Sequence, residues 1–346
     1  MNPFILIYGA YGYTGRLIIA ETLKHGLEPV LGGRNPDKLK ALAEPLGLKC
    51  RAFALNRPQD VDSGLEGMQA VIHCAGPFSH TADAMAEGCL RRKVHYTDIT
   101  GEIAVYEAMA ARDRAAREAG VMLMPGVGFD VVPSDCLALW LKQQLPTATT
   151  LTLGFYSRGG PSHGTAKTVV ESLIQSGMVR QNGKLVPVPG AWKQRGLDFG
   201  EEKRIGITIP WGDIASAYYS TGIPNIEVYM AAPASLRLFV HSTRYLGWLL
   251  GARSVQRFAS ARIPEGGPDE DKRARNYCLL WGEVTDSAGG RAEARMRTPD
   301  GYSLTAATAV CIARKILAGN APAGYQTPAK AYGSDLILEV EGTRRW

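Results

Sequence analysis

The chain has 346 residues, a formal net charge of +6, 45% hydrophobic residues and 21% charged residues. Because one hydrophobic core rarely supports this length, we expect two domains, or one domain with a large insertion. The composition excludes extensive disorder, and the scattered Lys and Arg residues do not favour nucleic acid as a partner.

From residue 4 to about residue 145, short apolar runs alternate with helix-length segments. This rhythm is typical of repeated βαβ units and a parallel sheet. Six strands in such an order predict an α/β fold, with a doubly wound Rossmann domain over residues 1–135. The expected strands are 4–8, 28–33, 49–55, 70–75, 95–99 and 121–125, and the expected helices are 14–25, 36–44, 58–65, 80–91 and 102–119.

A glycine turn of the form G-x-x-G-x-x-G follows the first expected strand. It opens a helix whose N-terminal amides and dipole would favour a pyrophosphate group. The strand before it, the helix after it and the distance to the second strand favour dinucleotide binding over a purely structural turn. The expected cofactor contacts in this turn are Gly9, Tyr11, Gly12, Tyr13, Thr14 and Gly15.

The second expected strand ends in Gly32-Gly33-Arg34, where an NAD enzyme usually carries an acidic residue for the ribose hydroxyls. Arg34, assisted by Lys38, can hold a 2′-phosphate because guanidinium groups match phosphate oxygens. NADP(H) is therefore the predicted cofactor. Two alternatives are that Arg34 only solvates a loop and that Asp37 reaches the ribose instead.

The loop Ala75-Gly76-Pro77-Phe78 follows the fourth expected strand, at the sheet edge where ligands bind in doubly wound folds. Gly76 permits a close backbone approach to the cofactor, and Pro77 fixes the course of the loop. We therefore expect Ala75, Gly76, Pro77 and Phe78 to contact the cofactor. The alternative is a tight strand exit with Phe78 in the core.

Carboxylates follow the next two strands. Asp98 ends the fifth strand and precedes Gly101-Glu102, a pattern that fits helix capping and a substrate contact equally well. Asp130, in Gly128-Phe129-Asp130 beyond the sixth strand, suits the anchoring of a loop through backbone hydrogen bonds.

After Pro146 the apolar residues alternate with period two over 149–156, 204–210 and 276–286, which predicts strands of a mainly antiparallel sheet. Segments 165–177, 234–250 and 303–318 are expected helices. Together they predict an α+β domain over 136–320 for substrate binding or dimerisation. Residues 321–346 are expected to pack back on the Rossmann domain.

The N-terminus has no basic region before its first strand, so we expect no signal peptide and a cytoplasmic location. The amphipathic segment 236–250 is interrupted by charged residues and is shorter than the ~20 apolar residues of a membrane span. Core packing, a dimer interface, a cover over a lipid-like substrate and peripheral membrane contact remain open for it. The six cysteines lie far apart without a C-x-x-C pair, so no metal site is expected.

None of the 14 tyrosines has Lys four positions later, which excludes the Tyr-x-x-x-Lys pair of short-chain dehydrogenases. The sequence also lacks H-E-x-x-H and G-K-[ST], so a zinc protease and a P-loop protein have no support. Hydride transfer from a nicotinamide cofactor remains. Tyr96, His163 and Tyr218 are conceivable proton donors, and a surface loop position is the alternative for His163.

Four segments besides Gly32-Gly33-Arg34 form a specific set: 73–78, 95–102, 125–135 and Gly164-Thr165. In this order they resemble the saccharopine dehydrogenase-like reductases, and most closely the branch with the trans-acting enoyl reductases. Thr327-Pro328-Ala329 resembles the closing segment of that family. The resemblance implies that the 75–78 loop contacts the nicotinamide half and that the 128–130 turn lies where two domains meet around the active site.

The leading hypothesis is an NADPH-dependent oxidoreductase that reduces a C=C (enoyl) bond, or a related C=N or C=O bond, in an apolar acyl or polyketide-type substrate. Its candidate catalytic residues are His163, Tyr96 and Asp130. A saccharopine-type amino-acid dehydrogenase is one alternative, with Arg158, Lys167 and Arg180 as candidates for binding substrate carboxylates. The other is a non-catalytic NADP(H)-sensing protein, since a Rossmann fold does not establish turnover.

Overall fold

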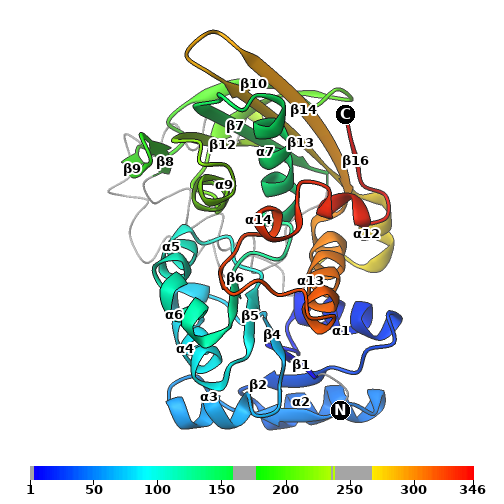
Figure 1. Ribbon diagram of the computed structural model, residues 1–346. Helices are drawn as coiled ribbons and strands as arrows, with labels where there is room; N and C mark the ends of the chain where they lie inside the picture. The colour runs from blue at the N-terminus through cyan, green and yellow to red at the C-terminus, as the bar shows by residue number, and fades with distance from the viewer. Residues whose placement is uncertain (1–3, 159–176, 235–236, 238–266) are drawn as a thin grey trace, which may run out of the picture. The chain divides into compact units, whose positions relative to one another are not determined.

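The computed structural model describes residues 4–158, 177–234, 237 and 267–346 (Figure 1). The chain divides into two units. The first unit holds residues 1–132 and 302–340, and the second holds residues 133–301 and 341–346. The chain therefore passes from one unit to the other three times, near residues 132, 301 and 340.

The first unit is built on a seven-stranded sheet in the order β3-β2-β1-β4-β5-β6-β15. Its neighbouring strands pair in parallel, and β1 and β4 at its centre are buried along their whole length. The predicted doubly wound Rossmann fold is confirmed. The strands are β1 Ile5–Tyr8, β2 Val30–Gly33, β3 Cys50–Ala52, β4 Ala70–His73, β5 His95–Asp98, β6 Met122–Met124 and β15 Gly324–Tyr325.

Helices join these strands, as the sequence pattern predicts. The expected helix 102–119 is two helices, because the backbone leaves the helical region at Arg112 and a new helix starts at Asp113, whose carboxylate accepts the Tyr325 N–H at 2.8 Å. The helices are α1 Tyr13–Lys24, α2 Pro36–Ala43, α3 Pro58–Gly64, α4 Ala82–Arg92, α5 Ile103–Ala111, α6 Asp113–Ala119, α13 Gly301–Leu317 and α14 Pro328–Tyr332, with 3-10 turns η1 Glu44–Leu46, η2 Phe78–His80 and η3 Leu336–Glu339.

The strand order reverses between β1 and β4, and ligands bind at the carboxyl ends of the strands at such a switch point. The loops that follow these two strands touch. A Cβ on Gly9, after β1, would lie 2.9 Å from the Ala75 nitrogen, after β4. The fold thus brings the glycine turn and the 75–78 loop to one place at the sheet edge.

Helix α13 belongs to the first unit, although the sequence pattern placed residues 303–318 in the second domain. The Thr308 hydroxyl donates to the Val127 carbonyl at 2.7 Å, and the Phe129 N–H donates to the Thr305 hydroxyl at 2.9 Å. The Tyr302 ring meets Tyr13 edge-on with centroids 5.2 Å apart, so α13 runs beside α1 (Figure 1). Helical periodicity indicates that a segment is a helix but not which sheet it covers.

The second unit carries a nine-stranded mixed sheet in the order β10-β11-β12-β7-β13-β14-β16, with the β8–β9 hairpin paired to β12. Strand β7 runs parallel to β12, and the other described pairs are antiparallel, so the predicted mainly antiparallel α+β architecture is confirmed. The strands are β7 Thr150–Ser157, β8 Gly177–Gln181, β9 Lys184–Val188, β10 Gln194–Asp198, β11 Lys203–Thr208, β12 Asn225–Ala231, β13 Tyr277–Thr285, β14 Arg291–Pro299 and β16 Arg344–Arg345, and the helices are α7 Val132–Gln144, α9 Asp213–Thr221 and α12 Glu270–Arg275.

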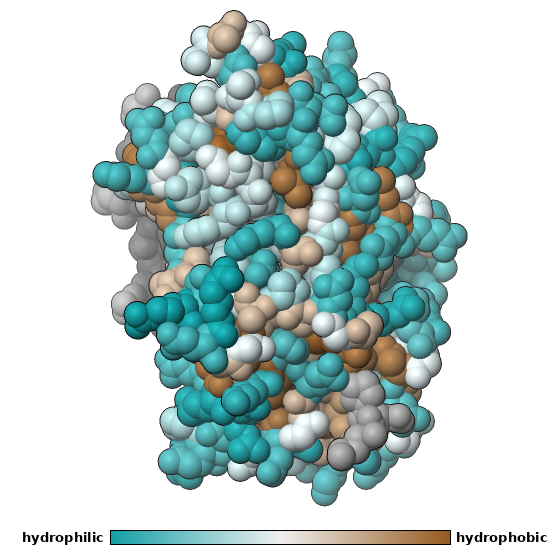
Figure 2. All heavy atoms as spheres, viewed as in Figure 1, coloured by the Kyte–Doolittle hydropathy of each residue, from teal (hydrophilic) through white to brown (hydrophobic). Residues whose placement is uncertain are grey.

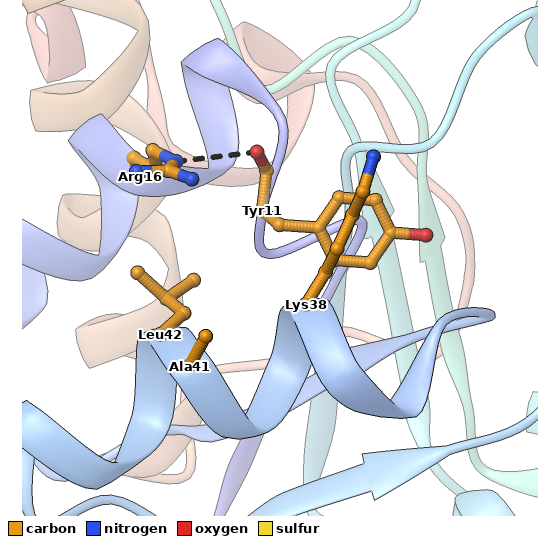
Figure 3. Close-up of a pocket in the computed structure, with 5 residues that line it drawn as sticks. All are labelled: Tyr11, Arg16, Lys38, Ala41 and Leu42. Carbon is orange, nitrogen blue, oxygen red and sulfur yellow. Dashed lines mark hydrogen bonds between the residues drawn. The ribbon is translucent and has the colours of Figure 1, made fainter.

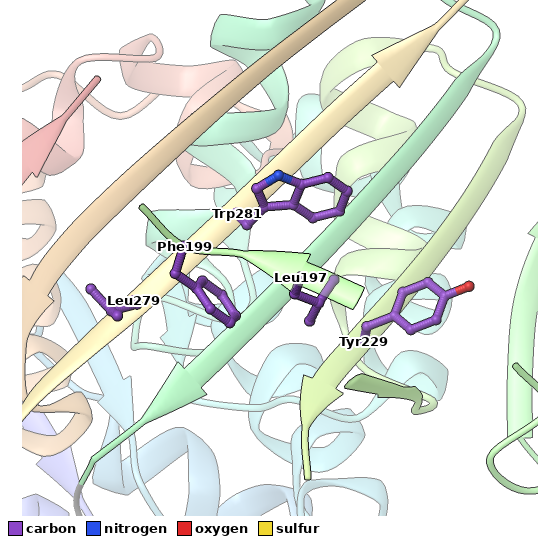
Figure 4. Packing of buried hydrophobic residues seen from close by; sticks show 5 residues of the cluster. All are labelled: Leu197, Phe199, Tyr229, Leu279 and Trp281. Carbon is purple, nitrogen blue, oxygen red and sulfur yellow. The ribbon is translucent and has the colours of Figure 1, made fainter. Parts of the chain in front are cut away.

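A hydrophobic cluster fills one face of this sheet (Figure 4). Gly154 on β7 leaves room for it, since a Cβ there would lie 2.8 Å from the Leu197 side chain of β10. Strand β10 therefore packs across β7 in addition to pairing with β11. The cluster consists of Leu197, Phe199, Tyr229, Leu279 and Trp281.

Two expected features lie outside the described residues, namely the helix 165–177 up to residue 176 and nearly all of the amphipathic segment 236–250. Among the described helices, none combines the length and apolar character that a membrane span requires. The face seen in Figure 2 is covered largely by hydrophilic residues, with apolar ones between them. Large apolar side chains that are exposed in the described part of the chain are Leu46, Ile205, Leu338 and Trp346.

Candidate cofactor site

The glycine turn is fixed to the second strand by backbone hydrogen bonds. The N–H groups of Gly9 and Ala10 donate to the Gly32 carbonyl at 2.9 and 3.1 Å, and Gly12 N–H donates to the Gly9 carbonyl at 3.0 Å. Helix α1 then starts at Tyr13 with Gly12 as its N-cap, a residue without a side chain. The N-terminus of α1 therefore has no side-chain cap, and its backbone amides are placed to bind an anion.

The three glycines of the turn permit its close packing. Gly9 has a φ of +87°, which a residue with a side chain rarely adopts. A Cβ on Gly15 would lie 2.5 Å from the Gly9 carbonyl oxygen, and one on Gly12 would lie 3.1 Å from the same atom. Glycine at these positions lets the turn pack closely at the helix N-terminus, with no side chain between its backbone and a ligand, and the residues present fit the pyrophosphate of a dinucleotide.

A basic pocket of about 280 Å³ lies beside the turn, between α1 and α2 (Figure 3). The Arg16 Nε donates to the Tyr11 carbonyl at 3.2 Å, and the Lys38 Nζ lies 5.8 Å from the centre of the Tyr11 ring. Ala41 and Leu42 of α2 complete the lining. Two cations on an otherwise apolar and aromatic wall make this pocket suited to an anionic group such as a phosphate.

Arg34 is exposed at the carboxyl end of β2, close to this pocket but not in its lining. Burial raises the pKa of Tyr8 to about 12, and the positive charge of Arg34 opposes that shift. The Tyr11 ring covers the strand end, since a Cβ on Gly33 would lie 2.7 Å from it. Asp37 is exposed in the first turn of α2, one residue before Lys38.

The 75–78 loop leaves the carboxyl end of β4, with Gly76 and Pro77 exposed and Phe78 partly buried. The Thr81 hydroxyl oxygen lies 2.8 Å from the Ala75 carbonyl and 3.1 Å from the Pro77 carbonyl. The loop is thus held on its carbonyl side by the residue that precedes α4. Its exposed glycine and proline face solvent at the switch point.

Asp98 and Tyr96 form a buried pair at the end of β5. The Tyr96 hydroxyl donates to Asp98 Oδ2 at 2.6 Å, while Asp98 Oδ1 accepts the N–H groups of Thr100 at 2.9 Å and Gly126 at 2.8 Å. Burial raises the pKa of Asp98 to about 6, although these three hydrogen bonds oppose the shift. Burial and the neighbouring Asp98 also raise the pKa of Tyr96 well above its usual value. Asp98 therefore ties β5 to the turn after β6.

Asp130 lies against the loop that follows β5. A Cβ on Gly101 would lie 2.9 Å from Asp130 Oδ2, and the Tyr106 hydroxyl lies 2.8 Å from the Thr100 carbonyl and 3.4 Å from the Asp130 carbonyl. The loops after β5 and β6 are therefore packed together at the same sheet edge. His163, Gly164 and Thr165 lie outside the described residues.

The structure gathers most of the residues singled out in the sequence. The glycine turn, the 75–78 loop, Asp98 and Asp130 all lie at or beyond the carboxyl ends of neighbouring strands. Tyr96 differs, because its side chain is fully buried and its hydroxyl is bound to Asp98. Sequence reasoning missed Arg16 as a pocket residue, although its place one helical turn after Gly12 is a signal for it.

A family model matches the part of the chain that carries this arrangement. Residues 5–124 match the saccharopine dehydrogenase NADP binding domain. The resemblance to the saccharopine dehydrogenase-like reductases and the prediction of NADP(H) as cofactor are thereby confirmed. The matched segment runs from β1 to the end of β6 and so contains the glycine turn, Arg34 and the 75–78 loop.

Individual relatives agree with the family model. The chain is 24% identical over 226 residues to a saccharopine dehydrogenase-like oxidoreductase of Rattus norvegicus, covering 56% of this chain and 53% of that protein. It is 23% identical over 273 residues to a trans-acting enoyl reductase of Mycobacterium bovis, covering 72% of this chain and 63% of that protein. The chain thus spans about half to two thirds of the length of these curated relatives.

The fold has a solved counterpart. A saccharopine dehydrogenase (L-Glu forming) from Saccharomyces cerevisiae superimposes with a TM-score of 0.67, covering 98% of this chain and 96% of that chain. The sequence identity is 13%, so this similarity establishes the fold and not the substrate.

Proposed function

We propose that this protein is an NADPH-dependent oxidoreductase that reduces the C=C bond of an apolar acyl or polyketide-type substrate. The observation that carries the cofactor half of the proposal is the glycine-lined N-terminus of α1 beside a pocket with two cations, Arg16 and Lys38. The amides of the first α1 turn bind the pyrophosphate. Arg34 and Lys38 bind the 2′-phosphate, with Tyr11 and Arg16 forming the adjoining wall.

The reaction follows from what such a cofactor supplies, which is a hydride. Reduction of an enoyl group would place that hydride on the β-carbon and would require a proton at the α-carbon. Asp130 and His163 remain our candidates for the proton step. The Tyr96 hydroxyl is an unsuitable donor, since it is buried and already hydrogen-bonded to Asp98. The similarity to the trans-acting enoyl reductase over 72% of the chain supports the choice of an enoyl substrate.

The saccharopine-type alternative gains no support from the described residues. Arg180 was a candidate for binding a substrate carboxylate, but its side chain is 4% exposed and donates to the carbonyls of Ile214 and Gly183, each at 2.8 Å. The Arg158 guanidinium lies 5.5 Å from the centre of the Tyr277 ring, and Lys167 lies outside the described residues. A homodimer and a cytoplasmic location stay predictions.

The cofactor assignment is tested by titrating the protein with NADPH and with NADH while following cofactor fluorescence, then repeating both with Lys38→Ala and Arg34→Ala. We expect each variant to bind NADPH about 10-fold or more weakly, because a charged hydrogen bond to phosphate contributes roughly 1.5–3 kcal/mol. NADH binding should not change. Lys40→Ala, an exposed lysine of α2 outside the pocket lining, is the matched control.

The reductase assignment is tested by offering enoyl thioesters, imines and amino acids and following the absorbance of NADPH. Turnover of an enoyl thioester supports the proposal. Turnover of an imine or amino acid alone favours the saccharopine-type activity, and tight NADPH binding without any turnover favours a sensor. Equal binding of NADH and NADPH that Lys38→Ala leaves unchanged would contradict the cofactor assignment.

A further inference from the structure

Glu102 holds the loop that leaves β4, although it sits on a different element. It is the N-cap residue of α5, but its side chain makes no capping hydrogen bond to that helix. Its carboxylate instead accepts two backbone N–H groups of the neighbouring loop, Phe78 at Oε1 and Ser79 at Oε2, each at 2.8 Å. One carboxylate thus fixes two consecutive peptide groups through charge-assisted hydrogen bonds.

The opposite side of this loop is also held. The Thr81 hydroxyl oxygen lies within 3.1 Å of the Ala75 and Pro77 carbonyls, and it lies 2.9 Å from His73 Nε2 at the buried end of β4. Thr81 therefore binds carbonyl groups of the loop, and Glu102 binds N–H groups at its end. Gly76 and Pro77 of this loop are exposed.

The position of Glu102 is itself determined by the site. Its N–H donates to the Thr100 hydroxyl at 3.0 Å, and the Thr100 N–H donates to the buried Asp98 carboxylate at 2.9 Å. Gly101, the residue between them, packs against Asp130, where a Cβ would lie 2.9 Å from Oδ2. Glu102 thus connects the loop after β4 to the loops after β5 and β6.

We propose that Glu102 is a positioning residue for the nicotinamide half of the cofactor. The 75–78 loop lies at the switch point, with Ala75 next to Gly9 of the phosphate turn, so its course sets the space in which the nicotinamide is bound. The adenosine half is held elsewhere, by Arg34, Lys38 and the basic pocket. This inference rests on the proposed function, because it requires NADP(H) in the crevice.

The two halves of the cofactor provide the test. NADPH contains the nicotinamide, whereas 2′,5′-ADP carries the 2′-phosphate and adenosine without it. For the full-length protein, we expect Glu102→Gln to weaken NADPH binding about 10-fold, because one amide N–H₂ group replaces an acceptor of the loop. The affinity for 2′,5′-ADP, measured by competition, should stay within about 2-fold of the wild-type value. If Glu102 served only the folding of the protein, its substitution would weaken the binding of both probes alike.

Glu118→Gln is the matched control, since Glu118 is an exposed carboxylate on α6 that lies 3.7 Å from Arg114. It should bind both probes as the wild type does. Glu102→Asp keeps the charge with a shorter reach, so it should lose NADPH affinity by less than Glu102→Gln. If Glu102→Gln does not fold, the affinities of Glu102→Asp for NADPH and for 2′,5′-ADP are compared instead.

The outcomes separate this inference from the proposed function. If the wild type binds neither NADPH nor 2′,5′-ADP, the cofactor assignment itself fails. If the wild type binds both and the Glu102 variants lose both equally, or lose neither, the positioning role of Glu102 is overturned. Selective loss of NADPH with retained 2′,5′-ADP binding supports it.

Discussion

His73 is a buried imidazole at the end of β4, among the rings of Tyr8, Phe78 and Tyr96. Its Nε2 lies 2.9 Å from the Thr81 hydroxyl, and its Nδ1 has no hydrogen-bond partner within the described structure. Burial lowers the pKa of His73 to about 3, because a charged imidazole would lose its hydration there. His73, which supports the 75–78 loop through Thr81, is therefore neutral in the folded state.

This neutral histidine makes stability depend on pH. In the unfolded chain His73 takes up a proton below its ordinary pKa of 6.5, whereas in the folded chain it does so only near pH 3. Its contribution is thus complete above pH 6.5 and is lost as the pH falls, by at most about 1.4 kcal/mol per pH unit. We expect the free energy of unfolding of wild type to fall relative to His73→Gln between pH 6.5 and about pH 4.

Urea unfolding at a series of pH values measures this difference, with His25→Gln, a surface histidine beside Glu21, as the control. The control keeps His73 and should therefore retain the fall in stability that His73→Gln loses. Parallel curves for wild type and His73→Gln across the whole range would show that His73 isn't buried in its neutral form.

Helix α2 carries the proposed 2′-phosphate ligand Lys38 in its first turn, and local capping holds that turn. The Asn35 side chain accepts the Lys38 N–H at 2.9 Å, and Pro36 begins the helix with a preset φ. Lys38 thus has two roles. Its backbone N–H takes part in the helix cap, and its side chain is the proposed phosphate ligand.

Removing the Asn35 cap should weaken the start of α2 and lower the stability of the protein only modestly. We expect Asn35→Ala to lower the free energy of unfolding by about 1 kcal/mol, since the Lys38 N–H loses its partner. Asn35→Ser keeps a side-chain acceptor, so its free energy of unfolding should fall by only a few tenths of that amount. Urea unfolding of the two variants checks the expectation, and equal stabilities of the Ala and Ser variants would contradict it.

At the scale of the whole molecule, the N-terminal sheet is completed by the C-terminal part of the chain. Strand β15 pairs with β6, the Tyr325 side chain is 2% exposed, and α13 binds Val127 and Phe129 through Thr308 and Thr305. The final residues 341–346 return to the second unit, where β16 pairs with β14. Each unit is therefore closed by a segment distant in sequence.

This connectivity makes a prediction about fragments. We expect residues 1–135 alone not to unfold cooperatively, because they lack α13 and β15 and would expose the apolar surfaces that these elements cover. A chain that joins residues 1–132 to 302–340 through a flexible linker should fold. Thermal unfolding followed by circular dichroism distinguishes them, and a cooperative transition of 1–135 at the temperature of the linked chain would disprove the expectation.

Local patterns in the sequence determined much of this protein. Alternating apolar runs located β1 to β6, and the spacing of Gly9, Gly12 and Gly15 located the phosphate turn, because a glycine cradle is a property of a few consecutive residues. The missing acid after β2 and the presence of Arg34 indicated NADP(H) for the same reason. In each case the decisive residues are neighbours along the chain.

Contacts between distant residues decided the remainder. β15 has two residues, too few for a recognisable period, and its pairing with β6 depends on a partner about 200 positions away. The helical pattern of α13 did not reveal which sheet it covers, and the Gly101-Glu102 motif did not reveal that the carboxylate binds Phe78 and Ser79. Only the order of the strands in the sheet brings these loops together, and sequence spacing carries no record of that order.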